Sequence, residues 1–430
     1  NYVVSLNGAD HVSFLNMTIR NTTSGNYSNA FSITGGADSC TIDGCVIKAG
    51  PTTYTGAGNY STGIYMYGTN HGNTFTNNRI EGGSCNIYAY GGGTTSRAEN
   101  TTIEGNEIKN SYFYTVYAYY LDGLEFNNNT VTNDSAMYLY GYGPFFVYVD
   151  KFNITNNFSG TDMQNGYYYG LYLSNCNGSN SPRSRVANNC INSGSGTGTS
   201  YGYYGVYTTG SGIFDFHHNS VARRGTSGTY YAGIFQSGGL ISLMNNSFYN
   251  QSGGYALYAP GGFTISESDY NNFYTSSGTL VYSGTTAFNT LADYQTASGN
   301  DMHSVQTDPN FQEALLCITC NDTLNAGGTP LANTPTDILG NTRSTFTPDI
   351  GPVEFVSAAS FTLGGDDTIC GNQVVVEAGP AQSVIWNVNN QTSTQNSVTL
   401  NANNEPVNFN ISVNITTQYC GNASDAVVIR

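Results

Sequence analysis

Apolar and polar residues alternate along residues 1 to about 285 in short runs, which is the spacing of β-strands with one buried face. Two kinds of run take turns. The first reads apolar, any residue, Asn or Gly, Asn, any residue, apolar, as in Phe126-Asn127-Asn128-Asn129-Thr130-Val131. The second is an apolar residue followed by an aromatic one, as in Ile64-Tyr65-Met66-Tyr67. Neither run has the i, i+3, i+4 spacing of a helix, so both are expected to form strands.

The two runs recur together, and the last apolar residues of successive first runs are 23 to 33 residues apart. Strands this short cannot bury an apolar face alone, so successive coils must stack and share a core, as in a solenoid. The recurring Asn pair suits a corner between strands, because Asn tolerates left-handed backbone angles. Stacked once per coil, its side chains are expected to hydrogen-bond in a ladder.

Over residues 1–285 this pattern resembles the right-handed parallel β-helix family of secreted proteins, which implies a parallel β-helix. Residues 286–358 break the repeat with the motifs Thr307-Asp308-Pro309, Asp337-Ile338-Leu339-Gly340-Asn341-Thr342-Arg343 and Asp349-Ile350-Gly351-Pro352-Val353-Glu354. These motifs are similar to the closing region of bacterial surface β-helix proteins of the "choice-of-anchor" type, although Pro352 and Val353 depart from that family's small and aromatic residues. The region is expected to cap the last apolar cross-section of the solenoid.

Residues 359–430 read as alternating strands at the spacing of a β-sandwich, with the single Trp386 in one of them. This segment resembles the Ig-like modules of secreted bacterial proteins. A disulfide between Cys370 and Cys420 would suit a domain this small. The whole chain is therefore expected to be all-β, a β-helix followed by its cap and an Ig-like β-sandwich.

The other cysteines are Cys317 and Cys320, spaced C-x-x-C, and five in the coils, which makes nine. A zinc site would need a second pair of Cys or His ligands, and the sequence has none at that spacing. Disulfides in an exported protein are the preferred interpretation, with one cysteine unpaired. Several coil cysteines are expected to be small core residues.

The formal charge is −16 with only 12 Lys and Arg, which argues against nucleic acid or an anionic membrane surface as a partner. Acidic polysaccharide would also be repelled unless cations intervened. No apolar run is long enough to span a membrane. The chain opens on Asn1 without a signal peptide, so it is expected to be a processed piece of an exported precursor, placed outside the cell or on its surface.

Catalysis on a β-helix would need carboxylates from adjacent coils at the same height, with an Arg or Lys near them. No two coil carboxylates are expected to share such a position beside an Arg. Glu81 and Glu107 come closest and are interpreted as solvated. His218 is expected to be a corner residue, beside His217, and Arg223 and Arg224 to begin a loop. No catalytic or metal-binding residue is assigned and no cofactor is expected, with calcium as the one open alternative.

In the second runs, the apolar residues are expected to point inward and the aromatic ones outward, as a ribbon of rings on one face. Such a ribbon could stack on sugar rings or pack against a second copy; the alternative is that the rings fill the core. The leading hypothesis is a non-enzymatic extracellular module for adhesion, binding glycan or protein. The alternatives are a polysaccharide lyase or glycoside hydrolase, and a filament subunit. Seventeen Asn-x-Ser/Thr sequons are compatible with glycosylation. The proposed binding residues are Tyr65, Tyr88, Tyr117, Tyr138, Tyr172, Tyr207, Phe235, Tyr258 and Tyr282.

Overall fold

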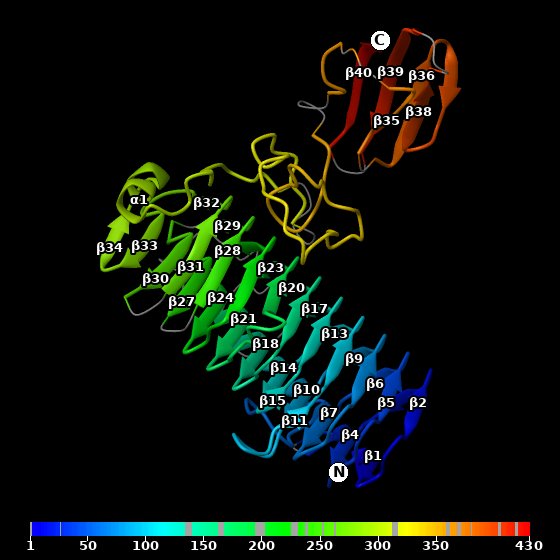
Figure 1. Ribbon diagram of the computed structural model, residues 1–430. Coiled ribbons are helices and arrows are strands. Elements are labelled where there is room, and N and C mark those ends of the chain that lie inside the picture. Colours follow the sequence, from blue (N-terminus) through cyan, green and yellow to red (C-terminus); the bar gives the residue numbers. More distant parts are fainter. Residues whose placement is uncertain are drawn as a thin grey trace.

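The computed structural model describes the chain except for residues 1, 26, 134–139, 162–166, 194–202, 225–230, 237–239, 252, 262–263, 312–316, 358–361, 367, 369–370, 380, 403–405 and 418–419. Its larger part is a right-handed parallel β-helix whose coils each contribute one strand to three long sheets (Figure 1). We name these sheets A, B and C. The predicted alternation of two runs is confirmed: the second run forms sheet A, and the two halves of the first run form sheets B and C.

Within the coils, each strand pairs in parallel with the same strand of the coil before and the coil after, so every sheet runs along the solenoid. Sheet A contains β1 (Tyr2–Asn7), β4 (Asn29–Thr34), β7 (Thr62–Tyr67), β10 (Cys85–Tyr90), β14 (Tyr114–Tyr119), β18 (Tyr140–Val147), β21 (Tyr167–Ser174), β24 (Tyr203–Thr209), β27 (Gly233–Gln236), β30 (Leu257–Pro260) and β33 (Val281–Gly284). Sheet B contains β2 (Ser13–Leu15), β5 (Thr41–Asp43), β8 (Thr74–Thr76), β12 (Thr102–Glu104), β16 (Glu125–Asn127), β19 (Asn153–Thr155), β22 (Ser184–Ala187), β25 (Phe214–His217), β28 (Leu240–Met244) and β31 (Thr264–Asp269). Sheet C contains β3 (Thr18–Arg20), β6 (Val46–Lys48), β9 (Arg79–Glu81), β13 (Glu107–Lys109), β17 (Thr130–Asn133), β20 (Phe158–Thr161), β23 (Cys190–Ser193), β26 (Ser220–Arg223), β29 (Ser247–Asn250) and β32 (Asn272–Thr275). A short pair, β11 (Ala98–Glu99) and β15 (Leu121–Asp122), lies between sheets A and B.

The Asn pair forms the corner between sheets B and C. Its first member is left-handed, with φ of 56° at Asn128 and 58° at Asn156. Its second member is buried and passes a hydrogen bond to the next coil, with Asn129 Nδ2 3.1 Å from Asn157 Oδ1. The predicted ladder is therefore confirmed. It runs without interruption through Asn78, Asn106, Asn129, Asn157, Asn189, Asn219, Asn246 and Asn271.

The end of the solenoid is closed by residues 286–305. Strand β34 (Thr286–Phe288) pairs antiparallel with β33, and helix α1 (Leu291–Ser298) buries Leu291 and Tyr294 against the solenoid core. Asp301 ends the ladder, because its Oδ1 accepts a hydrogen bond from Asn271 Nδ2 at 3.0 Å. The cross-section that the last coil would expose is thus covered.

Residues 306–311 and 317–356 do not extend this cap and lie instead along the side of the late coils (Figure 1). A disulfide between Cys190 of β23 and Cys317 joins the segment to sheet C, and a second disulfide joins Cys320 to Cys420. The predicted disulfide between Cys370 and Cys420 is therefore wrong, because Cys420 is bonded to Cys320. Cys370 lies outside the described residues. Cys190 faces outward from sheet C, where only the folded segment could bring it a partner. Among the described residues, the free cysteines are Cys40, Cys45, Cys85 and Cys176, and all four are buried, as expected for core residues.

The C-terminal part is two antiparallel sheets on a common core (Figure 1). One sheet pairs β35 (Gln373–Glu377) with β38 (Ser397–Asn401). The other orders β37 (Gln391–Ser393), β36 (Ser383–Val388), β39 (Phe409–Thr416) and β40 (Asn422–Ile429). Trp386 is fully buried between them, and its Nε1 donates to Gln395 O at 2.9 Å.

Candidate functional site

The outward face of sheet A is the most distinctive surface of the molecule. None of the sheet A strands contains Asp, Glu, Lys, Arg or His. Their apolar residues, such as Ile64, Ile87 and Val116, are fully buried, and the tyrosines that follow them lie on the other side of the strand. The outward orientation predicted from the alternation is therefore correct for Tyr65, Tyr88, Tyr117, Tyr172, Tyr207, Tyr258 and Tyr282, which are paired across the sheet.

These rings form a central row along the sheet. Ring centroids are 5.4 Å apart for Tyr65 and Tyr88, 5.3 Å for Tyr88 and Tyr117, and 5.0 Å for Tyr172 and Tyr207. The planes of these pairs are within 12° of parallel. Such spacing and orientation are those of offset stacking. The ring spacing follows from the distance between paired strands, which is about 4.8 Å.

Two of the predicted members of this row are not in it. Tyr138 lies outside the described residues, and the strand of its coil begins later, so Phe145 takes the place between Tyr117 and Tyr172. Phe235 points inward and is fully buried, with its ring 5.6 Å from that of Phe216. In that coil Ile234, not Phe235, is paired with Tyr207 and Tyr258. The strand there is shifted by one residue relative to the prediction, so Phe235 takes the inward face.

Two flanking rows were missed from the sequence although their signal was present. Tyr67, Tyr90 and Tyr119 stand two residues after the central row, with centroids 5.2 Å apart. Together with Tyr65, Tyr88 and Tyr117 they form what we call the six-ring grid, in which all neighbouring planes are within 14° of parallel. Further along, Tyr114, Tyr142, Tyr169 and Tyr204 form a row on the other side, edge-on to the central row.

The stacking decides which part of each ring meets solvent. Parallel rings only 5.2 to 5.4 Å apart cannot lie side by side in one plane, so the ring faces are turned toward each other. The surface therefore consists of ring edges and phenol hydroxyls. Burial raises the pKa of Tyr65 and Tyr117 to about 12, so these hydroxyls stay neutral hydrogen-bond donors at physiological pH. Tyr67 is the most open of the grid, with 48% of its surface exposed.

The two carboxylates singled out from the sequence are ion-paired on sheet C. Glu81 contacts Lys48, and its Oε2 is 3.1 Å from Arg79 Nη2. Glu107 Oε1 is 2.6 Å from Lys109 Nζ. The Lys48 ammonium is the largest cause of the lowered pKa of Glu81. Glu81 is thereby held ionised, and both carboxylates are engaged in ion pairs, which suits a structural role better than that of a general acid.

The expectation that no carboxylates share a height beside an Arg is wrong at the corner between sheets A and B. Asp122 is paired with Asp150 of the next coil and with Glu99 of the coil before. Arg97 Nη2 lies 3.1 Å from Asp150 Oδ2, and Lys151 Nζ lies 2.9 Å from Asp122 Oδ2. We call these three carboxylates with Asp10 and Asp38, which precede them, the acidic row. Among the described residues, no group of three or more His, Cys, Asp or Glu side chains is arranged to hold a metal ion.

His217 contacts a serine, but the pair lacks the geometry of a nucleophile and its base. His217 Nε2 is 2.9 Å from Ser242 Oγ, yet the nearest carboxylate, Asp215, lies 4.0 Å from that same nitrogen. A triad would need the carboxylate on Nδ1 to orient the ring. Ser242 is also 5% exposed, beneath the segment that carries Asn333, whose Nδ2 donates to Asp215.

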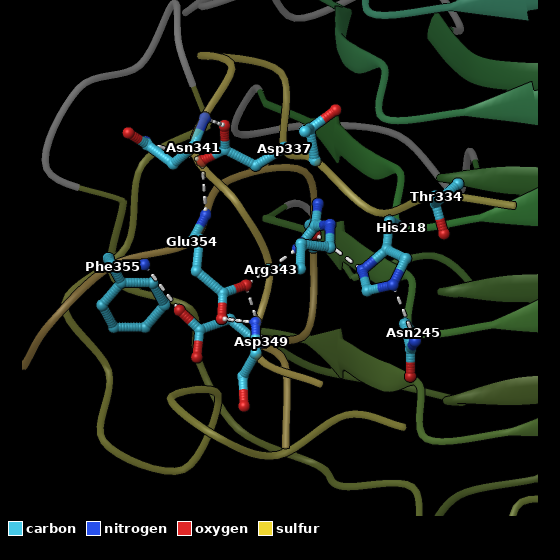
Figure 2. Close-up of polar contacts among 12 residues, drawn as sticks. His218, Asn245, Thr334, Asp337, Asn341, Arg343, Asp349, Glu354 and Phe355 are labelled. Carbon is cyan, nitrogen blue, oxygen red and sulfur yellow. Dashed lines mark hydrogen bonds and ion pairs between the residues drawn. The ribbon is translucent and has the colours of Figure 1, made fainter. Parts of the chain in front are cut away.

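His218 is a corner residue with φ of 51°, as predicted, and it also holds the lateral segment (Figure 2). Its Nδ1 is 3.3 Å from Gly351 O and its Nε2 is 2.8 Å from Asn245 Nδ2. Donation at Nδ1 and acceptance at Nε2 fit the neutral ring, and burial holds the pKa of His218 well below its usual value. Arg223 does not begin a loop: it ends β26 and is fully buried.

The motif residues of the lateral segment form a buried ionic network beside this histidine (Figure 2). Arg343 donates from Nη1 to Glu354 Oε2 at 3.1 Å and from Nη2 to Asn188 Oδ1 at 2.9 Å. Asp349 accepts from the backbone N–H of Phe355 at 2.6 Å, and Asp337 accepts from that of Glu354 at 2.8 Å. The motifs thus fasten the segment to the corners of three coils. We call residues 326–355 the latch.

Comparison with known families agrees with this architecture. The model of the right handed beta helix region matches residues 2–160 and 62–233, which together span more than half of the chain. The chain belongs to this family. No curated protein matches it.

Among solved structures, the crystal structure of the Dettilon tailspike protein is similar to this β-helix protein at 10% identity and a TM-score of 0.30. The match covers 97% of this chain and 65% of the tailspike chain, so this chain spans less than two thirds of that length. At that identity and TM-score the likeness says nothing about what the chain binds.

Proposed function

We propose that this β-helix is an extracellular recognition module that binds neutral glycan on the outward face of sheet A and catalyses no reaction. The observation that carries the proposal is a face free of charged side chains and lined by tyrosine edges whose hydroxyls stay protonated. Sugar hydroxyls need neutral donors and acceptors, and sugar C–H groups pack on aromatic carbon. Tyrosine supplies both at a low cost in conformational entropy.

The grid favours contact through hydroxyls and ring edges over stacking of a sugar on a ring face, because the faces are used in ring-to-ring stacking. The outer row of Tyr67, Tyr90 and Tyr119 is the most accessible part. A glycan chain lying along this row would meet a new hydroxyl at each coil, about 5 Å after the last one. The solenoid repeat thus provides a repeating site for a repeating ligand.

Two observations support a location outside the cell. The two disulfides would persist in an oxidising compartment, and the latch motifs resemble those of "choice-of-anchor" surface proteins. No helix among the described residues has the length and apolar character needed to cross a membrane.

The test is binding of the chain to an array of neutral glycans, followed by calorimetry on the best ligand. Changing Tyr67, Tyr90 and Tyr119 together to Phe removes three hydroxyls and keeps the rings, so affinity should fall about tenfold or more. Tyr274→Phe, on the outward side of sheet C, is the matched control and should bind as the wild type does.

Three outcomes would overturn the proposal. The wild type could bind no neutral glycan, or the triple Phe variant could keep full affinity. Alternatively, the wild type could cleave the glycan it binds, which would favour the polysaccharide-degrading alternative. Sedimentation that shows self-association lost with the same tyrosine changes would assign the face to a second copy instead.

A further inference from the structure

The first four strands of sheet C gather cations in a chain that is otherwise acidic. Arg20 is paired with Lys48, Lys48 with Glu81, and Glu81 with Lys109, so these side chains stand in one row across four coils. Arg79 stands two residues before Glu81 on the same strand, in the neighbouring row of the same face. Four of the 12 Lys and Arg residues of the chain are therefore in this one place. The strands β6, β9 and β13 can be followed side by side in Figure 1.

The row lines a groove of about 500 Å³. It is lined by the four cations and Glu81, and by residues that follow these strands, such as Asn21, Gly82 and Asn110. Lys48 and Arg79 form ion pairs with Glu81, and Lys109 forms an ion pair with Glu107. Arg20 is exposed, and no carboxylate of the described residues lies within 4.0 Å of its side-chain nitrogens. Four cations thus face two carboxylates, which leaves a local excess of positive charge.

We propose that this groove binds an acidic polysaccharide, whose carboxylate or sulfate groups contact Arg20 and Lys48. The guanidinium of Arg20 offers the paired donors that carboxylate and sulfate oxygens accept, and no carboxylate of the protein competes for them. Lys48 stands one coil away, so two successive acidic groups of an extended chain can be met along the row. The site is on a different sheet from the tyrosines and does not depend on the proposed binding of neutral glycan.

The acidic row of a second copy is the other polyanion that could fit, and the structure disfavours it. Three of its five members, Asp38, Asp122 and Asp150, are half-buried at a corner, and the last two already contact Lys151 and Arg97, whereas Asp10 and Glu99 are exposed. Asp and Glu side chains are short, and when fixed on a corner, as here with two of them already ion-paired, they cannot reach far into a groove. An extended polysaccharide can, because its acidic groups project from a thin chain.

The test is calorimetric titration of the full chain at low ionic strength with polygalacturonate, dextran sulfate and neutral dextran. Polygalacturonate presents carboxylates and dextran sulfate presents sulfates, so binding to either one supports the site and tells which anion it prefers. Arg20→Gln should weaken binding about tenfold. Glu81→Gln should tighten it, because it removes a competing carboxylate. Lys151→Gln, which removes an exposed cation at another corner, should leave it unchanged.

The site would be refuted if the wild type bound neither polyanion better than neutral dextran. Equal weakening by Arg20→Gln and Lys151→Gln would also refute it, since it would show only a response to net charge. Tighter binding of duplex DNA than of both polysaccharides, or salt-sensitive self-association lost in Arg20→Gln, would assign the groove to a different partner. The triple Phe variant of the grid should bind polyanion normally, so this site and the tyrosine face can fail separately.

Discussion

Removing one rung of the Asn ladder should destabilise the solenoid strongly, although the change is only the loss of one small polar side chain. Asn157 accepts at Oδ1 from the backbone N–H of Asn129 at 2.9 Å and donates from Nδ2 to Phe126 O at 2.8 Å. It is 3% exposed, and Phe126 is fully buried. In Asn157→Ala both backbone groups lose the side chain that satisfies them, in a place that water does not reach.

The magnitude follows from those two groups. A buried donor or acceptor left without a partner costs about 1–3 kcal/mol, so the free energy of unfolding should fall by about 3–5 kcal/mol. Asn153→Ala is the matched control, because Asn153 also donates to a neighbouring coil, at 2.8 Å to Glu125 Oε1, but is only half-buried. Its cost should be about 0.5–1 kcal/mol.

Urea unfolding followed by far-ultraviolet circular dichroism measures the solenoid, while the fluorescence of Trp386 follows the C-terminal sheets separately. Amide exchange at Asn129 should also quicken in Asn157→Ala, since its N–H loses its acceptor. A loss of less than 1 kcal/mol, equal to that of Asn153→Ala, would refute the view that the ladder holds the coils together. It would mean that the burial of apolar side chains is sufficient to hold the coils together.

Three further predictions concern pH and the disulfides. Burial raises the pKa of Tyr65, Tyr117 and Tyr172 to about 12, whereas unfolded tyrosines ionise near about pH 10. The unfolded chain therefore releases protons first, and stability should fall as pH rises from about 10 to 12; absorbance titration of native and urea-unfolded chain should show the gap, and coincident curves would contradict it. Burial lowers the pKa of His217 to about 4, so the unfolded chain takes up a proton below about pH 6.5 that the native chain refuses. Stability should accordingly fall by up to about 3 kcal/mol as pH falls through that window, as measured by urea unfolding at each pH, and His217→Gln should flatten the dependence. Finally, Cys190→Ser with Cys317→Ser should expose the latch to limited proteolysis and leave the circular dichroism of the coils unchanged; an uncut latch would show that its ionic network suffices.

Much of the site was readable from the sequence, because strand alternation is local. Tyr65 and Tyr117 point outward since Ile64 and Val116 beside them point inward, and that holds whatever the neighbouring coils do. The acidic row could also have been predicted from the sequence but was not. Asp122 and Asp150 each lie seven residues before a ladder Asn, and Asp38 lies seven residues before Cys45, whose backbone N–H donates to the first ladder Asn, Asn78. Phe235 could not be placed, because a shift of one residue after a loop reverses the faces of a strand, and nothing local marks the shift.

By itself, then, the sequence determined the coil, its corner and its ladder, since each depends on residues a few positions apart. Tertiary structure decided which residues from distant parts of the sequence come into contact. Cys190 forms a disulfide with Cys317, which lies 127 residues later in the sequence, and His218 contacts the backbone oxygen of Gly351. Both contacts exist because a folded segment lies against sheet C and its corner. The basic groove also depends on tertiary structure, because the stacking of strands places Arg20 beside Lys48. The net charge of the chain, −16, gives no indication of this local positive site.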